Sequence, residues 1–327
     1  MTQSVFVTGA TGFIGRHLVD VLLEKGFSVT AMVRTPETAN LPDAVTVLKG
    51  DITSMTSLQQ AMPDGVDGVF HVAADTSSFR KEADRQAAIN VQGTANVIDV
   101  ANDKRAGRFI HVSSVVVFGL QKREITETTP MAGLRSWVSY VRTKSQAERL
   151  VRQAGERGLD TVIVNPTHVV GHYDTANWAR LIKRSASGEL PGIPPGCGNF
   201  ANGRAVAEAM VTAFEKAPSG ANYLLGGPVA SFEEFIREAA GQTGASVKVK
   251  VLPAFVLKLL STLGHWGYLL TGKRPNLTPE EAYFACEDIV ASSARAEEEL
   301  GYRIVPLKDS IAESVAYLRE VGELPSA

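Results

Sequence analysis

The amino-acid sequence predicts an α/β fold, a doubly wound parallel sheet with a smaller C-terminal domain interleaved with it. Short β-branched runs alternate with helical stretches through the first half of the chain, and a glycine-rich turn joins the first strand to the first helix. The 327 residues are 44% hydrophobic and 21% charged, a composition typical of a packed globular protein. At this length we expect one large domain or two interlocked domains.

The strands and helices of the first half follow one another in regular alternation. We expect strands at residues 5–8, 28–33, 68–73, 108–113 and 161–165, and helices at 14–24, 85–102 and 137–157. Together they predict a dinucleotide-binding domain over residues 1–171.

The alternation weakens after Gly171, and a smaller substrate-binding domain is expected mainly over residues 172–327. Residues 191–203 hold three prolines and four glycines, which predicts a loop. A helix at 205–215 and a strand at 222–225 are expected to rejoin the main sheet, so residues 205–228 return to the first domain. Three further helices are expected at residues 232–241, 279–286 and 310–321.

One apolar segment, residues 251–270, is considered as a membrane element. Pro253, Lys258 and Gly264 interrupt it, so no uncharged run reaches the 20 or so residues that a spanning helix needs. We expect a buried or pocket-lining pair of helices, with association with a membrane surface as the alternative. The three tryptophans, at positions 137, 178 and 266, are expected in the core or in pocket walls.

Charge and cysteine content exclude several classes of function. The chain has 33 basic and 35 acidic residues, a net charge of −2. This balance gives no excess of positive charge of the kind that binds nucleic acid. Its two cysteines, Cys197 and Cys286, cannot form a disulfide framework and lack zinc-site spacing, so no metal is expected. The N-terminus has no signal-peptide pattern, and we expect a cytoplasmic protein.

The glycine-rich turn after the first strand is typical of dinucleotide binding. Gly9 can make the tight turn, Gly12 lets the backbone approach a pyrophosphate, and Gly15 allows the helix to pack closely on the strand. The N–H groups at the start of the helix then face the phosphates. The residues expected to bind the cofactor here are Gly9, Thr11, Gly12, Phe13, Ile14 and Gly15.

The residue that ends the second strand bears on the choice between NAD and NADP. An acid at this place hydrogen-bonds the ribose hydroxyl of NAD, whereas a base accommodates the 2′-phosphate of NADP. The strand at 28–33 ends in Arg34, and the next carboxylate is Glu37. This favours NADP, with NAD possible if Arg34 is only a solvated surface residue.

Tyr140 and Lys144 lie four residues apart on an expected helix, hence on one face of it. A neighbouring ammonium favours the phenolate, so we expect Lys144 to lower the pKa of Tyr140 and make the phenol a better proton donor and acceptor. Ser114 follows the strand at 108–113, where its hydroxyl can hydrogen-bond a substrate oxygen.

Taken together, the motifs resemble the extended short-chain dehydrogenase/reductases, which have a Rossmann fold. The matching segments are TGATGFIG (8–15), GDIT with Asp51, HVAA (71–74), INVQGT (89–94), HVSSVVVFG (111–119), YVRTK (140–144), NPTHVVG (165–171) and LGYR (300–303). The resemblance implies a catalytic triad of Ser114, Tyr140 and Lys144, with Lys144 also bonding the nicotinamide ribose. It further implies cofactor contacts from Asp51, Ile52, Ala73, Ala74, Pro166 and Val169.

Within this family the chain is most similar to the dihydroflavonol-reductase and 3β-hydroxysteroid-dehydrogenase branch. Arg34, residues 166–171 and the apolar segment carry that similarity. Sugar-nucleotide dehydratases have an Asp-Glu pair directly after the catalytic hydroxyl residue, and here Val115 and Val116 stand there. The chain therefore lacks the two carboxylates that this dehydration needs.

Other candidate residues are expected to be structural. His71, His111 and His168 lie in or beside apolar strands and are interpreted as satisfied interior histidines, although His168 is close enough to the expected nicotinamide site to face substrate. Asn90 is expected to bond backbone near the active-site strand, and no role is assigned to Cys197.

These observations favour an NADP(H)-dependent oxidoreductase that moves hydride between nicotinamide and a carbonyl or secondary alcohol of a small, apolar substrate. A nucleotide-sugar epimerase that retains its NAD(P) and uses the same triad is the first alternative. A non-catalytic dinucleotide sensor is the second. Because the expected long helices resemble those that pair in dimers of the family, we expect a homodimer.

Overall fold

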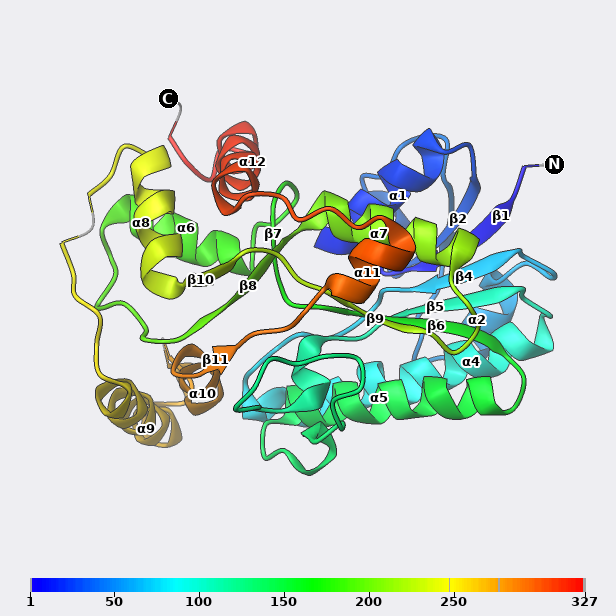
Figure 1. The fold of residues 1–327 in the computed structure, drawn as a ribbon. Coiled ribbons are helices and arrows are strands. Elements are labelled where there is room, and N and C mark those ends of the chain that lie inside the picture. The colour runs from blue at the N-terminus through cyan, green and yellow to red at the C-terminus, as the bar shows by residue number, and fades with distance from the viewer. Residues whose placement is uncertain (1, 247, 276, 326–327) are drawn as a thin grey trace.

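The computed structural model describes residues 2–246, 248–275 and 277–325. Within these residues a parallel sheet of seven strands has the order β3-β2-β1-β4-β5-β6-β9, as expected for a doubly wound fold (Figure 1). The strands are β1 (Ser4–Thr8), β2 (Ser28–Val33), β3 (Thr46–Lys49), β4 (Gly68–His71), β5 (Arg108–Val112), β6 (Asp160–Pro166) and β9 (Asn222–Leu225).

Helices cover both faces of this sheet. Helices α1 (Phe13–Glu24) and α7 (Gly203–Lys216) lie on one face, and α2 (Met55–Ala61), α4 (Thr94–Asp103) and α5 (Ser139–Glu156) lie on the other (Figure 1). Successive residues of β1 point to opposite faces, so Val5 and Val7 join the core under α1 and α7, while Phe6 joins the core under α2, α4 and α5.

The helix expected at residues 85–102 is interrupted. It consists of α3 (Ala83–Ala87), a π-helical turn (Ala88–Gly93) and α4. A π turn widens the helix locally, and such turns are frequent at functional sites. Here the turn carries Asn90, whose side chain reaches toward the segment after β4.

A second, smaller sheet brings together β7 (His168–Val170), β8 (Cys197–Asn202), β10 (Val229–Ser231) and β11 (Asp288–Ile289). Helices α6 (Trp178–Ser187), α8 (Phe232–Gln242) and α12 (Leu307–Glu320) enclose its core, while α11 (Ala294–Leu300) packs near α7 and β9. The strand expected at 222–225 is β9, which pairs in parallel with β6, so the chain returns to the main sheet after α7.

The loop expected at residues 191–203 is wrong for its second half, which forms β8. Its glycines mark close packing: a Cβ on Gly196 would lie 2.6 Å from the Glu287 carbonyl oxygen, and one on Gly198 would lie 2.6 Å from Nε2 of His168. Glycine in a strand often marks such a close approach by a neighbour, and composition alone does not distinguish it from a loop.

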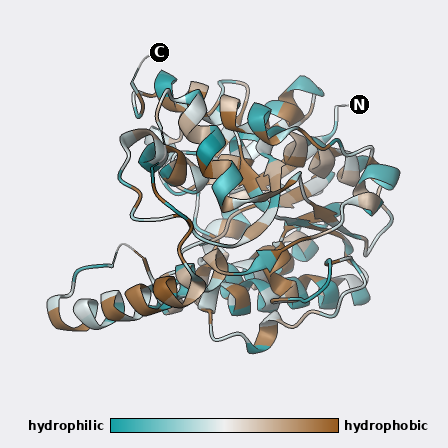
Figure 2. Ribbon diagram, turned by 60° about the vertical axis from the view of Figure 1, so that its left-hand side comes forward, coloured by the Kyte–Doolittle hydropathy of each residue, from teal (hydrophilic) through white to brown (hydrophobic). Residues whose placement is uncertain are grey.

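The prediction of a buried or pocket-lining pair of helices at residues 251–270 is also wrong. The segment forms one helix, α9 (Ala254–Thr271), which stands away from the body of the molecule (Figure 2). Most of its large apolar side chains are exposed, because the neighbouring elements cover only one side of it. Trp266, on this helix, and Trp137 are 62% and 48% exposed, so neither lies in the core. In the part of the chain that the structure describes, no helix is long and apolar enough to cross a membrane.

Candidate functional site

The glycine-rich turn between β1 and α1 has the geometry that its sequence predicts. Gly9 has a φ of +77°, and a Cβ there would lie 2.6 Å from the backbone nitrogen of Ala73. A Cβ on Gly15 would overlap the carbonyl oxygen of Gly9. Gly12 precedes the first turn of α1, where a Cβ would meet only the Gly9 carbonyl oxygen, at 3.3 Å. That side of the turn lines a cleft, an arrangement that fits close approach by a pyrophosphate.

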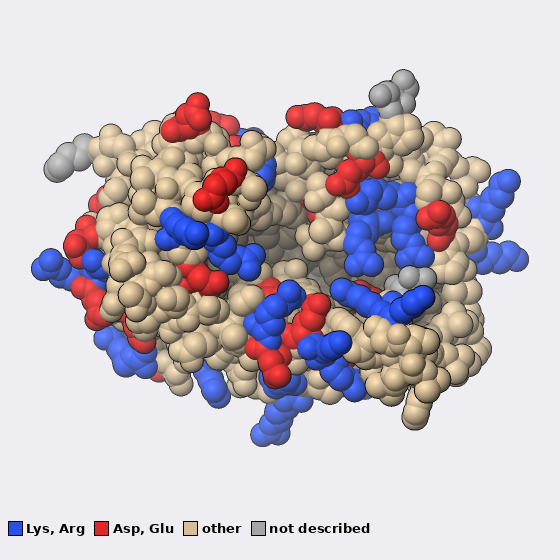
Figure 3. All heavy atoms as spheres, turned by 180° about the vertical axis from the view of Figure 1, so that it is seen from behind, with Lys and Arg blue, Asp and Glu red and all other residues tan. Residues whose placement is uncertain are grey.

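The cleft has a volume of about 760 Å³. A hollow is visible in the middle of the face shown in Figure 3, with basic side chains on both sides of it. Every residue predicted for the site lines this cleft: Gly9, Thr11, Gly12, Phe13, Ile14, Gly15, Arg34, Asp51, Ile52, Ala73, Ala74, Ser114, Tyr140, Lys144, Pro166 and Val169.

These residues meet because of the direction of the strands. Arg34 follows β2, Ala73 comes soon after β4, Ser114 comes soon after β5, and Pro166 ends β6. The carboxyl ends of parallel strands share one edge of the sheet, where ligands bind in open α/β folds.

The part of the cleft expected to hold the adenine is shaped by local contacts. Oδ1 of Asp51 accepts hydrogen bonds of 2.8 Å from both the backbone N–H and the hydroxyl of Thr53. Ile52 packs against Gly93 of the π turn. A Cβ on Gly93 would lie 2.7 Å from the Cδ1 atom of Ile52. Arg34 is exposed at the end of β2, and in the described residues no carboxylate lies within ion-pair distance of it.

Ser114, Tyr140 and Lys144 all line the cleft. Ser114 caps a short 3₁₀ turn, and its Oγ accepts a hydrogen bond of 3.4 Å from the backbone N–H of Val116. Tyr140 is in the first turn of α5, and Lys144 lies one turn later. The buried Lys144 ammonium donates a hydrogen bond of 2.7 Å to the carbonyl oxygen of Val112. Burial lowers the pKa of Lys144 to about 8, although the charge of Glu148 acts in the opposite direction.

The pKa of Tyr140 is raised in this structure, so the expectation of a lowered pKa is wrong for it. Burial raises the pKa of the phenol, hydrogen bonding with Ser114 acts to lower it, and the charge of Asp75 adds to the rise. The desolvation of the phenol therefore outweighs its polar contacts. The phenol stays protonated at neutral pH, as a proton donor must.

Asn90 has the structural role that its position predicts. Its Oδ1 accepts a hydrogen bond of 2.7 Å from the backbone N–H of Asp75, and its Nδ2 donates one of 2.9 Å to the carbonyl oxygen of the same residue. Nδ2 also lies 3.2 Å from Oγ1 of Thr143, which neighbours Lys144 on α5. One buried amide thus ties the segment after β4 to helix α5.

Two buried histidines lie beneath the site. Oγ1 of Thr94 donates to the carbonyl oxygen of Asn90, so it accepts from Nε2 of His71, and Nδ1 of His71 accepts from Thr8. Burial lowers the pKa of His71 to about 3, which keeps the ring neutral. His111 is buried as well, but neither ring nitrogen has a hydrogen-bond partner among the described residues, so the expectation of a satisfied side chain is wrong for it.

Aromatic side chains form one wall of the same cleft, the aromatic wall. The rings of Trp178 and Phe232 stack with centroids 5.5 Å apart, and His168 meets Trp178 edge-on at 4.7 Å. Burial lowers the pKa of His168 to about 4, so its ring is neutral. Phe284 also lines the cleft. Sequence analysis did not identify Phe232 and Phe284 as site residues, because only the fold brings residues so far apart in sequence together.

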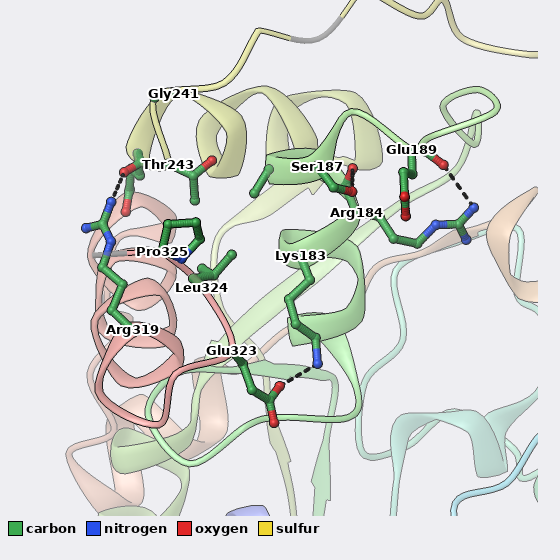
Figure 4. Close-up of a pocket in the computed structure, with 13 residues that line it drawn as sticks. Lys183, Arg184, Ser187, Glu189, Gly241, Thr243, Arg319, Glu323, Leu324 and Pro325 are labelled. Carbon is green, nitrogen blue, oxygen red and sulfur yellow. Dashed lines mark hydrogen bonds and ion pairs between the residues drawn. The ribbon is translucent and has the colours of Figure 1, made fainter. Parts of the chain in front are cut away.

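A second cavity, of about 780 Å³, lies between α6, α8 and the end of α12 (Figure 4). Its basic groups bond within the protein. Lys183 donates to the carbonyl oxygen of Thr175 and pairs with Glu323, and Arg319 donates to the carbonyl oxygen of Gln242. None of the residues predicted for the site lines it, so the first cleft is the candidate active site.

Comparison with known proteins identifies the family of the chain. Residues 5–226 match the model of the NAD dependent epimerase/dehydratase family. The chain is 32% identical over 311 residues to a 4-hydroxy-2-methyl-3-oxo-4-farnesyl-3,4-dihydroquinoline-1-oxide ketoreductase of Stigmatella aurantiaca, covering 91% of each chain.

A second relative and a solved structure are similar over most of the chain. A 3beta-hydroxysteroid-dehydrogenase/decarboxylase of Arabidopsis thaliana is 29% identical over 345 residues, which cover 94% of this chain and 61% of that protein. The crystal structure of gox2253 superposes with a TM-score of 0.85 at 28% identity, covering 99% of this chain and 100% of that one. The expected branch is confirmed. This chain belongs to the NAD dependent epimerase/dehydratase family and is an enzyme of the extended short-chain dehydrogenase/reductase type.

Proposed function

We propose that the enzyme is an NADP(H)-dependent oxidoreductase that transfers hydride between nicotinamide and a carbonyl or secondary alcohol of a small, apolar substrate. One observation carries the proposal. The glycine-rich turn, the three residues Ser114, Tyr140 and Lys144, and the aromatic wall all line a single cleft. One cleft therefore offers groups suited to a dinucleotide, to a reacting carbonyl and to an apolar substrate body.

The bound nicotinamide dinucleotide supplies or accepts the hydride. In the reducing direction, the Ser114 hydroxyl holds the carbonyl oxygen and Tyr140 gives that oxygen its proton. Lys144, held by its hydrogen bond to the Val112 carbonyl oxygen, carries a positive charge one helical turn from Tyr140 and is expected to bond the nicotinamide ribose. The charge stabilises the phenolate that remains after proton transfer. The raised pKa of Tyr140 keeps the donor protonated until the reaction begins.

The aromatic wall supports an apolar substrate. Trp178, Phe232 and Phe284 offer ring surface, and neutral His168 adds a polar edge without a charge. The ketoreductase of Stigmatella aurantiaca is named for a substrate with a farnesyl chain. We infer that this chain also takes a carbonyl compound with a large apolar part.

Arg34 supports NADP. Its side chain is exposed at the end of β2 and lines the cleft, where a 2′-phosphate would find a cation that has no carboxylate within ion-pair distance among the described residues.

The test is nicotinamide absorbance over time with NADPH or NADH and pools of alicyclic or aromatic ketones and of nucleotide sugars, with product analysis. Oxidation of NADPH with a ketone is expected, and Tyr140→Phe should reduce turnover at least ~100-fold while cofactor affinity changes less than ~3-fold. Flat absorbance with a change of configuration in a sugar nucleotide would establish the epimerase instead. Cofactor binding without turnover of any substrate would favour the dinucleotide sensor.

We also propose a homodimer that pairs through the long helices α4 and α5. Light scattering on the purified protein should give the mass of two chains, and the mass of one chain would overturn this.

A further inference from the structure

Helix α9 exposes an apolar face that no other described element covers. Leu270, Phe255, Trp266 and Leu269 are 87%, 71%, 62% and 60% exposed. Leu259 and Leu263, on the same helix, are also exposed. A soluble monomer rarely shows so many large apolar side chains in one place unless they mark an interaction surface.

The opposite face of α9 holds it on the protein. Leu257 and Ser261 are buried, and Gly264 faces Pro275. The ring of Tyr268 meets Phe79 edge-on, with centroids 5.1 Å apart. These contacts recur at intervals of three and four residues, so they form one stripe along α9. The exposed apolar side chains lie on the other side of the helix, which we call its outer face. The outer face is therefore fixed toward solvent.

The chain around α9 is strongly basic. Residues 243–279 contain no Asp or Glu, although the whole chain has a net charge of −2. Glu287 pairs with Lys258, and Glu281 lies 3.7 Å from Arg274, whereas no described carboxylate lies within ion-pair distance of the other three cations. The five basic side chains, all exposed, are Lys248, Lys250, Lys258, Lys273 and Arg274.

Helix α9 also lies beside one wall of the cleft, through its inner side. Helix α10 (Pro279–Ala285) packs against α9, and its Glu281, Phe284 and Ala285 line the cleft. An apolar phase at α9 would therefore lie one helix away from the cleft.

We propose that α9 docks the enzyme on the surface of an anionic lipid bilayer, with the outer face at the boundary between headgroups and acyl chains and the five cations against the headgroups. An amphipathic helix with apolar residues on one side and Lys or Arg nearby binds such a surface without crossing it. A second copy of the chain fits less well. Pairing α9 with its symmetry mate would bring two basic, carboxylate-free segments together, and like charges repel.

Docking does not depend on the reaction, but delivery of substrate from the bilayer rests on the proposed function. The experiment therefore measures binding without substrate. Purified protein is sedimented with vesicles of phosphatidylglycerol and phosphatidylcholine, and with phosphatidylcholine alone. Wild-type protein is expected to bind the anionic vesicles, less strongly at high salt, with a blue shift of tryptophan fluorescence that is lost in Trp266→Phe.

Two variants and a control separate the contributions. The apolar variant Leu263→Ser/Trp266→Ser/Leu270→Ser and the charge variant Lys248→Glu/Lys250→Glu/Lys273→Glu should each lower the binding constant for anionic vesicles at least ~10-fold. The control Val229→Ser/Ile304→Ser/Val321→Ser removes exposed apolar residues elsewhere and should bind like wild type. Circular dichroism checks that all remain folded.

Three outcomes would overturn the proposal: no wild-type binding to anionic vesicles, equal binding by wild type and the apolar variant, or a wild-type dimer that the apolar variant dissociates while neither binds vesicles. The last would assign the outer face to a second copy of the chain. Since no outcome involves nicotinamide chemistry, failure of docking and failure of the proposed oxidoreductase activity remain distinguishable.

Discussion

The ammonium group of Lys144 donates a hydrogen bond of 2.7 Å to the carbonyl oxygen of Val112, the last residue of β5. This bond ties α5 to the strand that leads to Ser114. Lys144 is only 2% exposed, so its charge is held at the site at a cost in stability that the backbone carbonyl only partly offsets.

Replacing Lys144 with Met should therefore separate stability from activity. The Met side chain fits the same space without a buried charge, so we expect the free energy of unfolding at neutral pH to rise by about 1–3 kcal/mol. Turnover should fall at least ~100-fold, because the phenolate of Tyr140 loses its neighbouring charge. Urea unfolding and steady-state kinetics measure both, and Lys308→Met, an exposed change, serves as the control. A destabilised Lys144→Met protein would show that the ammonium stabilises the fold.

The pH dependence of the reduction should report the same group. The folded-state pKa of Lys144, about 8, lies below its ordinary value of 10.5, so the ammonium present at neutral pH is lost as the pH rises through about 8. We expect kcat/KM for reduction to fall about tenfold per pH unit above that value. A profile between about pH 6 and 10 checks this, and a flat profile across that range contradicts it. Stability should change in the other direction, rising with pH between about 8 and 10.5, because the unfolded chain binds the extra proton there.

Gly15→Ala should disable the phosphate-binding turn. The new methyl group would overlap the Gly9 carbonyl oxygen, so the turn or helix α1 must move. We expect cofactor affinity to fall at least ~10-fold and stability to fall by about 1–3 kcal/mol. NADPH titration by fluorescence and urea unfolding measure these effects. Gly241→Ala is the matched control, since it also lies in a helix but has nothing within 4 Å of its Cβ position. Unchanged NADPH binding by Gly15→Ala would refute this role of the turn.

Arg34→Ala should shift cofactor choice. A hydrogen bond to a charged group contributes about 1.5–3 kcal/mol, so the KM for NADPH should rise about 10- to 100-fold while the KM for NADH changes little. Steady-state kinetics with both cofactors gives the ratio. Arg303→Ala, a change of an exposed arginine outside the cleft and outside α4 and α5, controls for loss of surface charge. An equal change in the KM for NADPH and the KM for NADH would contradict the proposed preference for NADP.

Local sequence determined most of the framework. The strand at 28–33 and the strand at 222–225 have the predicted bounds, because β-branched and apolar runs between turn residues carry enough information by themselves. Short-range sequence likewise determines the conformation of the first glycine-rich turn. It also puts Tyr140 and Lys144 on one face of a helix, because they are four residues apart. The residues predicted for the site meet in one cleft because parallel strands share their carboxyl edge.

Only the tertiary structure decided the features that depend on distant partners. Strand β8 exists because β7, β10 and β11 pair with it, although its glycines predict a loop. The pKa of Tyr140 rises because the fold buries the phenol, an effect that helical spacing does not contain. The aromatic wall joins Trp178, Phe232 and Phe284 from separate helices.

The exposure of helix α9 is also a feature that only the tertiary structure decided. Its sequence determines that it is apolar, but whether such a helix is buried or exposed depends on what packs against it. In this fold α10 and the Phe79 segment contact its inner side, and the described part of the chain provides nothing for the outer face. Hydrophobicity is a property of the residues, whereas burial is a property of the packing around them.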